Sequence, residues 1–283
     1  MTASLPRSPR SFDRDVLAAA DAWGAGRWGV GVVDPDGLVA ERGTRDVRLP
    51  WASVTKLVTA YATLIGVHRG VLALDDAAGP PGSTVRHLLA HASGLAFDDP
   101  TVVSAPARTR VYSNAGFDAV AAAVEKAARE PFGVLIRAWV LDPLGMAGAT
   151  LEGKPSQGMT GTLRDLEAFA FELVAPSLLP APFLAAATSV AFPGLRGVLP
   201  GFGRMDPLDW SLGFELRAAK APHWMGTRNS PRTFGQFGGS GTFLWVDPDA
   251  RLGLVALTDR PFGEWARRAW PAFADAVLAA AGP

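Results

Sequence analysis

The sequence predicts a mixed α/β (α+β) protein, in which helices from both ends of the chain flank an antiparallel β-sheet and an all-helical lobe is inserted between its strands. Two observations carry this prediction. Segments of strand type gather near both ends of the 283 residues, and the segments between them are of helical type. Because both groups of strands must bury an apolar face, a single shared sheet is the most economical arrangement.

The N-terminal part predicts a helix followed by a β-hairpin. Residues 13–23 have aspartates in their first turn, as helices often do. Residues 27–33 alternate small and β-branched side chains, and a second apolar run starts at Leu38. Residues 34–37 read Asp-Pro-Asp-Gly, which is typical of a tight turn between two strands.

The central part predicts a series of helices. Over residues 53–70, apolar side chains recur three and four positions apart, which places them on one broad face toward a core. They are Val54, Leu57, Val58, Tyr61 and Leu64. Further helices, joined by loops rich in Gly and Pro, are expected over residues 85–91, 115–129, 132–141, 163–173 and 182–188.

The C-terminal part returns to strands and closes with a helix over residues 263–281. The expected strands cover residues 210–217, 233–237, 241–246 and 252–258. We therefore expect residues 1–64 and 206–283 to form a sheet domain and residues 65–205 to form a mainly helical domain. The active site would lie between the two domains.

Composition limits the functions that the chain can have. The 27 Lys and Arg balance the 27 Asp and Glu, so no overall field attracts nucleic acid or an anionic membrane. The chain has no cysteine, which excludes disulfides, thiolate metal ligands and a cysteine nucleophile. No apolar run is long enough to span a membrane, and the first residues lack the apolar core of a secretory signal, so we expect a cytoplasmic protein.

The first motif with candidate chemistry is Ser53-Val-Thr-Lys56. The serine begins a predicted helix, and the lysine follows one turn later on the same face, so its amine can reach the hydroxyl. The N-terminus of the helix also favours the negative charge that develops when a serine attacks a carbonyl. The alternative is that Ser53 only caps the helix and that Lys56 is solvated.

The second motif is Tyr112-Ser113-Asn114, which precedes another predicted helix. By itself it could be an asparagine cap beside a buried tyrosine. Together with the serine and lysine some sixty residues earlier, it points to a shared catalytic site.

With these motifs in this order, the chain resembles the serine β-lactamase and penicillin-binding-protein superfamily, in particular its class C β-lactamase, DD-peptidase and family VIII esterase branch. Further strings that carry the resemblance are Leu-Ala-Leu-Asp-Asp at 72–76, His-Leu-Leu-Ala-His-Ala-Ser-Gly-Leu at 87–95, Pro-Leu-Gly-Met at 143–146 and Gly-Gln-Phe-Gly-Gly at 235–239. The resemblance implies a β-lactamase/transpeptidase-like fold, a small-molecule ester, amide or lactam as substrate, and neither cofactor nor metal.

The resemblance also implies roles for individual residues. Ser53 would form an acyl-enzyme, with either the amine of Lys56 or the tyrosinate of Tyr112 as the base. To be half neutral at pH 7, Lys56 needs a pKa about 3.4 units below its reference value. Asn114 would hold the substrate carbonyl or amide and the Lys56 amine. The backbone N–H groups of Ser53 and Gly239 would form the oxyanion hole.

The third motif departs from the family pattern, because Gln236-Phe237-Gly238 replaces the usual Lys-Thr-Gly or His-Thr-Gly before Gly239. These residues would line the substrate side of the site without the basic group that anchors a substrate carboxylate. We therefore expect weak or no β-lactamase activity, unless Arg228 or Arg232 substitutes. We expect a serine hydrolase, an esterase or amidase for a small intracellular molecule. Two alternatives stay open: a catalytically impaired binding protein of this fold, and a transacylase in a biosynthetic pathway.

Three other patterns predict no separate function. Glycines over residues 24–29 are spaced like a dinucleotide fingerprint, but they follow a helix and open a strand, which reverses the required order. His87 and His91 are spaced like zinc ligands but lack a clear third ligand, and we expect His91 to hydrogen-bond within the loop at residues 93–94. Trp51 could line the pocket, although we expect it to pack in the core.

Overall fold

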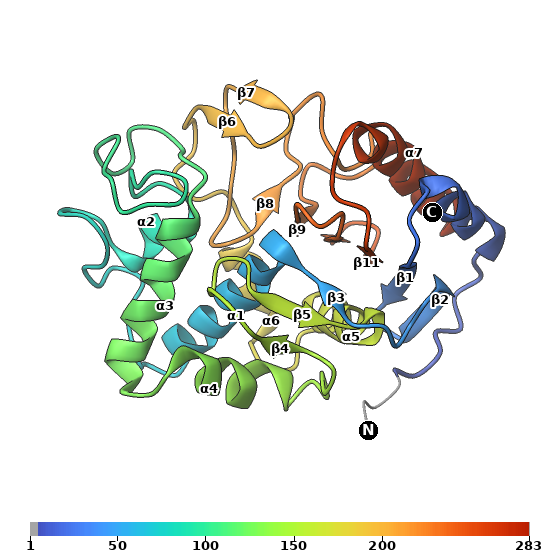
Figure 1. Ribbon diagram of the computed structural model, residues 1–283, viewed down its shortest axis with the longest axis horizontal. Coiled ribbons are helices and arrows are strands. Elements are labelled where there is room, and N and C mark those ends of the chain that lie inside the picture. The colour runs from blue at the N-terminus through green and yellow to red at the C-terminus, as the bar shows by residue number, and fades with distance from the viewer. Residues whose placement is uncertain (1–4, 283) are drawn as a thin grey trace.

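The computed structural model describes residues 5–282 and is built on a six-stranded antiparallel sheet (Figure 1). The strand order is β2-β1-β11-β10-β9-β8, so strands from the start of the chain lie beside strands from its end. The strands are β1 (Trp28–Asp34), β2 (Gly37–Gly43), β8 (Glu215–Leu216), β9 (Phe234–Phe237), β10 (Phe243–Asp247) and β11 (Leu252–Thr258). In the pairing of β1 with β11, Val30 lies opposite Ala256. The predicted fold class is confirmed.

Aspartates fix the turns of two hairpins in this sheet. Asp34 accepts the N–H two residues further on at 2.9 Å between β1 and β2, and Asp247 does the same at 3.0 Å between β10 and β11. Such side-chain turns mimic a backbone turn. The first hairpin also requires Gly37, because its φ is +134° and a Cβ there would lie 2.1 Å from the Pro6 carbonyl oxygen.

Helices cover both faces of the sheet. The 3-10 helix η1 (Arg14–Trp23) and the C-terminal helix α7 (Glu264–Ala280) lie together on one face, over an apolar cluster that includes Trp245 and Trp270. The helix α5 (Leu163–Val174) lies against β1 and β11 on the other face. The helix predicted over residues 13–23 thus forms, but with the tighter 3-10 geometry.

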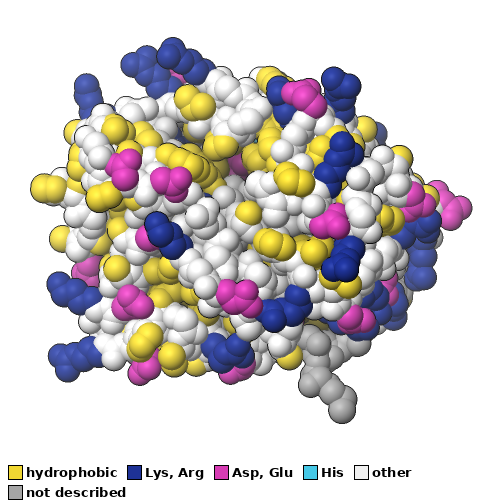
Figure 2. All heavy atoms as spheres, in the orientation of Figure 1, with side chains coloured by type: hydrophobic (Ala, Val, Ile, Leu, Met, Phe, Trp, Pro, Cys, Tyr) yellow, Lys and Arg dark blue, Asp and Glu magenta, His cyan; other side chains and the backbone are white. Residues whose placement is uncertain are grey.

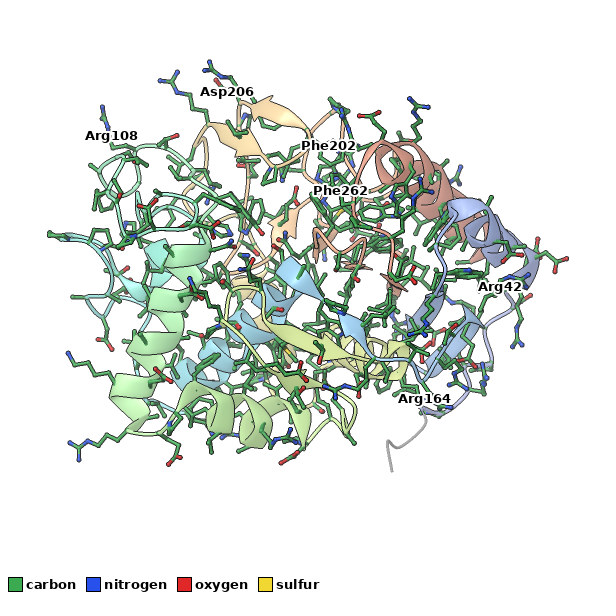
Figure 3. All side chains as sticks on the ribbon, viewed as in Figure 1. Arg42, Arg108, Arg164, Phe202, Asp206 and Phe262 are labelled. Atoms are coloured by element: carbon green, nitrogen blue, oxygen red, sulfur yellow. The ribbon has the colours of Figure 1, made fainter. Side chains whose placement is uncertain are left out.

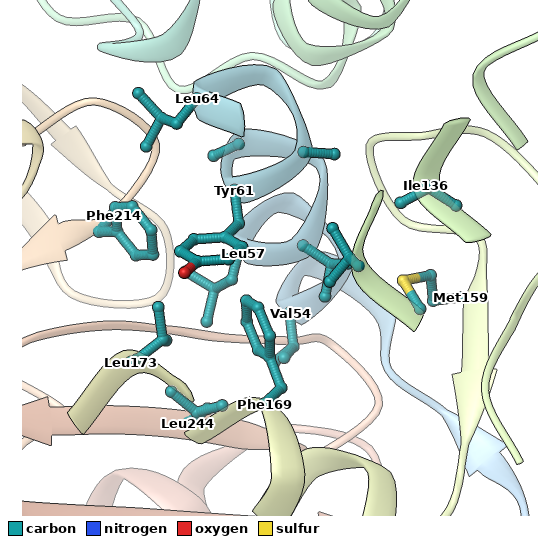
Figure 4. Packing of buried hydrophobic residues seen from close by; sticks show 14 of the residues in the cluster. Val54, Leu57, Tyr61, Leu64, Ile136, Met159, Phe169, Leu173, Phe214 and Leu244 are labelled. Carbon is teal, nitrogen blue, oxygen red and sulfur yellow. The ribbon is translucent and has the colours of Figure 1, made fainter. Parts of the chain in front are cut away.

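The helix α1 (Thr55–His68) runs through the interior between the sheet and the other helices (Figure 4). The spacing of its large apolar residues predicts one buried face, yet every residue from 55 to 66 is buried. Apart from Lys56 and Ile65, the other positions carry Ala, Gly and Thr, which are small enough for neighbouring elements to pack closely on all sides. Tyr61, for example, meets Phe169 of α5 edge to face, with ring centroids 5.6 Å apart.

The remaining helices surround α1. They are η2 (Ala52–Val54), α2 (Val85–Leu89), α3 (Asn114–Ala128), α4 (Phe132–Ile136), the π-helical turn η3 (Arg137–Leu141) and α6 (Ala181–Ala187). The helix predicted from residue 53 therefore begins as a 3-10 turn, and the one predicted over 132–141 is divided between α4 and η3.

Within residues 5–282, five short strands lie outside the main sheet. They are β3 (Leu49–Pro50), β4 (Thr150–Leu151), β5 (Met159–Gly161), β6 (Gly197–Leu199) and β7 (Gly203–Met205), of which the first three form one small sheet and the last two a hairpin. The strand predicted over 210–217 is wrong except at β8. The chain bends at Gly213, where φ is +97° and a Cβ would lie 2.1 Å from the Cβ of Ala60.

Figure 1 shows α2 and α3 to the left of α1, α4 below it, and α7 and the strands β1 and β2 to the right. The helix α5 belongs by sequence to the expected helical domain, 65–205, but it packs on the sheet. The division of the chain into those two domains stays a prediction. Among residues 5–282, none of the helices combines the length and the apolar character needed to cross a bilayer.

Candidate active site

Ser53 lies in η2, between the short strand β3 and the interior helix α1. The residue before it, Ala52, has a φ of +45°, a left-handed conformation that costs energy for any residue with a Cβ. Trp51 anchors this turn: it is fully buried, its N–H donates to the Met159 carbonyl at 2.9 Å, and its carbonyl accepts the Val54 N–H. The turn leaves Ser53 half-buried, whereas Trp51 packs in the core as expected.

Lys56 follows one turn later and is fully buried. Its Nζ donates to three oxygens: Ser53 Oγ at 3.2 Å, Asn114 Oδ1 at 2.5 Å and the Ser156 carbonyl at 2.9 Å. The alternative of a solvated lysine is therefore wrong. The three acceptors match the three N–H groups of an ammonium.

The environment of Lys56 brings its amine close to the point at which it loses its charge. Burial lowers the pKa of Lys56 to about 7, because desolvation disfavours the ammonium. The carboxylates of Asp118 and Asp98 act in the opposite direction. Near neutral pH, both the amine and the ammonium are therefore present in substantial fractions.

The start of α3 brings the second motif to the same place. Ser113 caps this helix by accepting the Gly116 N–H at 2.9 Å, so the cap is the serine and not Asn114. Asn114 is buried and bridges two charged groups. Its Oδ1 accepts from Lys56, and its Nδ2 donates to Asp98 Oδ1 at 2.7 Å.

Tyr112 is buried with its hydroxyl toward Ser53 and Gln236. Burial raises the pKa of Tyr112, a hydrogen bond with the Ser53 side chain lowers it in part, and the nearby charge of Glu215 raises it further. Its pKa lies well above the ordinary value as a result. The phenol therefore stays protonated at neutral pH.

His91 packs against the ring of Tyr112, with centroids 4.5 Å apart. Its Nδ1 accepts the Ser113 N–H at 3.0 Å, so the expected side-chain bond within the loop at residues 93–94 is wrong. Burial, together with the charges of Lys56 and Arg110, holds the pKa of His91 well below its usual value. The ring is therefore a neutral support for the start of α3.

His87, the other half of the considered zinc pair, bonds elsewhere. Its Nδ1 lies 2.9 Å from the Thr84 hydroxyl, one helical turn before it. Within the part of the chain that the structure describes, no three His, Cys, Asp or Glu side chains are arranged to hold a metal ion.

The strand β9 brings Gln236 to Tyr112. The Nε2 of Gln236 donates to the Tyr112 hydroxyl at 3.3 Å and to the Phe237 carbonyl at 3.0 Å. Because a carbonyl can only accept, the second bond fixes which end of the amide faces the tyrosine. The third-motif position thus supplies a hydrogen-bond donor without a positive charge.

The side chain of Phe237 belongs to an aromatic cluster under α7. Its ring centroid lies 4.6 Å from that of Phe262 and 6.1 Å from that of Phe202. Figure 3 shows Phe202 and Phe262 close to each other between β7 and α7. This packing holds the end of β9 in place, and a contact between Phe237 and a substrate stays a prediction.

The turn after β9 runs directly beside the backbone of Ser53. A Cβ on Gly238 would lie 2.4 Å from the Trp51 carbonyl oxygen and 3.1 Å from the Ser53 nitrogen, so only glycine fits. The next residue, Gly239, is exposed, and its N–H donates to none of the residues 5–282. The two N–H groups expected to form an oxyanion hole therefore come from adjoining segments.

Neither of the two arginines considered as substitutes for a third-motif cation has a described hydrogen bond or ion pair with these residues. Arg232 forms an exposed ion pair with Asp249 at 3.1 Å, and the backbone N–H of Arg228 donates to Asp275 of α7. The exception considered above, that one of these arginines substitutes for the missing basic group, has no support in these contacts.

A groove leads away from Tyr112. A cavity of about 330 Å³ is lined by Phe97, Thr109, Arg110, Val111, Tyr112, Gly197, Val198 and Pro200. Among the polar members, Thr109 donates to the Arg196 carbonyl and Arg110 to three other carbonyls, whereas the buried Nε of Arg110 has no partner among residues 5–282. Figure 2 shows this face of the molecule hollowed near its upper centre, with hydrophobic side chains on both sides.

Three further residues belong to the site and carry no motif. The backbone carbonyl of Ser156 accepts a hydrogen bond from Lys56, and Asp118 Oδ1 accepts one from the Ser156 N–H at 3.1 Å. Asp98 accepts from Asn114. A backbone carbonyl leaves no mark in a sequence, and isolated aspartates in loops and on helices are too common to single out.

The chain is similar to known proteins over nearly its whole length. Residues 19–279 match the family model described as Beta-lactamase. A crystal structure of a beta-lactamase from Mycobacterium bovis is 47% identical with a TM-score of 0.93, covering 95% of this chain and 100% of that one. No curated protein matches the chain.

More distant structures share the fold. A mutant of simvastatin synthase from Aspergillus terreus is 17% identical with a TM-score of 0.76, covering 94% of this chain and 93% of that one. EstCE1, described as a hydrolase with promiscuous acyltransferase activity, is 17% identical with a TM-score of 0.71, covering 93% and 96%. At this identity the likeness shows the fold alone.

Proposed function

The chain belongs to the Beta-lactamase family, and from this membership we propose that it is a serine hydrolase that forms an acyl-enzyme on Ser53. The observation that carries the proposal is the buried amine of Lys56, whose Nζ lies 3.2 Å from Ser53 Oγ. A serine hydroxyl is a weak nucleophile and needs an adjacent base. We propose Lys56 as that base.

In the proposed acylation, Ser53 Oγ attacks the substrate carbonyl carbon while its proton passes to the neutral amine of Lys56. The lowered pKa of Lys56, about 7, supports this role because a large fraction of the amine is neutral at pH 7. The ammonium that forms keeps Asn114 Oδ1 and the Ser156 carbonyl as partners. Tyr112 is the weaker candidate for the base, because burial raises its pKa.

The oxyanion of the tetrahedral intermediate would accept the N–H groups of Ser53 and Gly239. One such donor is worth about 3–4 kcal/mol of transition-state stabilisation. The bond to the leaving group then breaks, and the leaving oxygen or nitrogen takes the proton held by Lys56, with the Tyr112 hydroxyl placed to relay it. Water next attacks the acyl-enzyme, gives its proton to Lys56, and Ser53 recovers a proton as the acid departs.

We propose uncharged esters of small molecules as the substrates, with amides as slower ones. Gln236 offers Tyr112 a neutral donor, so the site lacks the usual anchor for a carboxylate. The groove beside Tyr112 is bordered by Phe97 and Val198, which are 51% and 55% exposed and available to an apolar group. These features favour an apolar acyl or alcohol group and disfavour penicillins.

The test combines covalent labelling with turnover. The protein is treated with a fluorophosphonate, and its peptides are analysed by mass spectrometry for an adduct on Ser53. We expect the adduct in the wild type and in a Ser189→Ala control, whose serine lies exposed at the end of α6. In Ser53→Ala we expect no adduct and a loss of p-nitrophenyl butyrate hydrolysis of at least about a hundredfold. An unlabelled wild type without turnover would refute the proposal.

Two other functions are candidates for the same site. Two proteins that share the fold are described as a synthase and as a hydrolase with acyltransferase activity, so transfer of the acyl group to an alcohol or amine is the second candidate. Analysis of the products with added alcohol separates transfer from hydrolysis. The neutral Gln236 motivates the third candidate, an impaired binding protein, for which Ser53→Ala would change neither ligand affinity nor turnover.

A further inference from the structure

A chain of hydrogen bonds links Lys56 to an aspartate that no motif contains. Lys56 Nζ donates to Asn114 Oδ1 at 2.5 Å, and Asn114 Nδ2 donates to Asp98 Oδ1 at 2.7 Å. Lys56 and Asn114 are buried, whereas Asp98 is exposed. The hydrogen-bonded path from the carboxylate to the catalytic lysine therefore runs through the amide between them.

This arrangement decides the orientation of the Asn114 amide. A carboxylate can only accept, so it attracts the NH₂ end of the amide and leaves the oxygen to face Lys56. If the amide turned over, its oxygen would face Asp98 and its NH₂ group would face the Lys56 amine. Bonds to charged groups are roughly twice as strong as neutral ones, so losing both at once would be costly.

The backbone around Asp98 is fixed to the same helix end. The carbonyl of Phe97 accepts the N–H groups of Asn114 and Ala115 at 2.6 and 3.2 Å, and the carbonyl of Ala96 accepts the Ser113 hydroxyl at 2.6 Å. Asp98 is thus carried on a segment that is bonded to the start of α3. Its side chain is held where the Asn114 amide requires it.

We propose that Asp98 is a positioning residue of this active site, which acts through Asn114 to hold the Lys56 amine toward Ser53. The inference rests on the proposed function, because it assigns Lys56 a catalytic task. Asp98 itself touches neither Ser53 nor the lysine nitrogen among the described hydrogen bonds. Its effect on the reaction should therefore depend on the presence of Asn114.

Asp98 also contributes to the charge balance around Lys56. The charged groups that face the amine are Asp98 from its loop and Asp118 from α3, and Asp118 is also paired with Lys154. The uncharged groups around the amine are Asn114 and Phe117 of α3, Tyr112, neutral His91 and the Ser156 carbonyl. Both aspartates favour the ammonium. Removing the charge of Asp98 should thus lower the pH at which kcat/KM rises as Lys56 loses its proton.

The experiment compares Asp98→Ala, Asp98→Asn and Asp99→Asn across the pH range from 5 to 9, with p-nitrophenyl butyrate as substrate. Asp99 is the matched control, because it is exposed on the same loop and its described hydrogen bonds go to the N–H and the side chain of Thr101. We expect Asp98→Ala to lower kcat/KM about tenfold. Asp98→Asn keeps a hydrogen-bond acceptor for Asn114, so we expect the plateau of its kcat/KM pH profile to lie near that of the wild type. Because it removes the charge, we expect the midpoint of that profile to be lowered by about 0.5 pH unit. Asp99→Asn should match the wild type.

A double-mutant cycle separates positioning from a merely structural role. In an Asn114→Ala background, we expect Asp98→Ala to cause no further loss, because the path through the amide is already broken. Additive losses, or wild-type kinetics and pH profile in both Asp98 variants, would overturn the inference while leaving Ser53 as the nucleophile. A wild-type protein that neither reacts with fluorophosphonate nor turns over ester would overturn the proposed function and this inference together.

Discussion

At the scale of single residues, Lys56 and Gln236 determine the charge that the site presents to a substrate. Lys56 is buried and its nitrogen is shared by three oxygens, so its charge does not face open space. Gln236 donates to Tyr112 without carrying a charge. Neither side chain offers an exposed cation to a substrate carboxylate.

Replacing Gln236 with lysine should therefore change substrate preference. A charge-assisted hydrogen bond in a desolvated cleft contributes about 1.5–3 kcal/mol, which corresponds to a gain of about 10- to 150-fold in kcat/KM. We expect that gain for nitrocefin, a lactam with a carboxylate, and little change for uncharged p-nitrophenyl butyrate. Gln236→Met is the control, since it keeps the length and adds no charge. An equal gain on both substrates would contradict the argument.

Which site residues the sequence could predict depends on how each one acts. Ser53 and Lys56 act through side chains at a fixed helical spacing, and such a spacing is visible in a sequence. Ser156 acts through a backbone carbonyl some hundred residues later, which any residue type could supply. Asp98 acts through Asn114, and only the folded loop brings the two side chains together.

At the scale of elements, a buried hydrogen bond joins the interior helix α1 to α5. The Tyr61 hydroxyl donates to Glu172 Oε1 at 2.5 Å. The same carboxylate accepts the N–H groups of Ser177 and Leu178, which come after the end of α5. One side chain thus connects two helices and the loop that leaves the second of them.

Removing this hydrogen bond should lower the stability of the fold and leave the rate of ester hydrolysis unchanged. We expect Tyr61→Phe to lower the free energy of unfolding by about 1–3 kcal/mol, because a bond to a buried carboxylate is lost. Ester hydrolysis should stay near the wild-type rate. Tyr112→Phe, at the chain's other tyrosine, should show the opposite pattern of slow hydrolysis and a smaller change in stability. Urea unfolding and turnover assays measure both, and a Tyr61→Phe variant as slow as Tyr112→Phe would contradict this division.

The elements differ in how well a sequence can predict them. The range expected for the helix at 163–173 is within one residue of α5, and the strand expected at 252–258 coincides with β11. Both are long enough for a hydrophobic period to show. The strands β3 and β4 have two residues each, which is too short for any period, and their pairing depends on tertiary contacts.

At the scale of the whole molecule, stability depends on Glu167, a buried carboxyl group between α5 and the sheet that has one unpartnered oxygen. Glu167 is 2% exposed, and its Oε1 has no partner among residues 5–282. Burial, and then the charge of Glu41, raise the pKa of Glu167 to about 8. In the unfolded chain, Glu167 releases its proton above the ordinary glutamate pKa of 4.5, whereas in the folded protein it keeps this proton up to about pH 8. The free energy of unfolding therefore falls as the pH rises from 4.5 to 8.

Glu167→Gln should remove most of this pH dependence. One unit of pKa shift corresponds to about 1.4 kcal/mol, so we expect the wild type to lose at least about 2 kcal/mol of unfolding free energy between pH 5 and pH 8. The glutamine variant should lose much less, and Glu130→Gln, at an exposed position, should behave like the wild type. Urea titrations at the two pH values give the comparison. Parallel losses in all three proteins would show that Glu167 is not the cause.

The pairing of β1 with β11 also affects how the protein is made. A growing polypeptide emerges from the ribosome with β1 and Ser53 early, but β11, the strand between β1 and β10, is synthesised only after all the other strands of the sheet. Until β11 is made, the partly made chain has an open sheet edge. Until β9 and the turn at Gly238 are made, the backbone of residues 51–53 also lacks the segment that packs beside it in the finished protein. We therefore expect chains that stop short of β11 to show no ester hydrolysis and to be prone to aggregate.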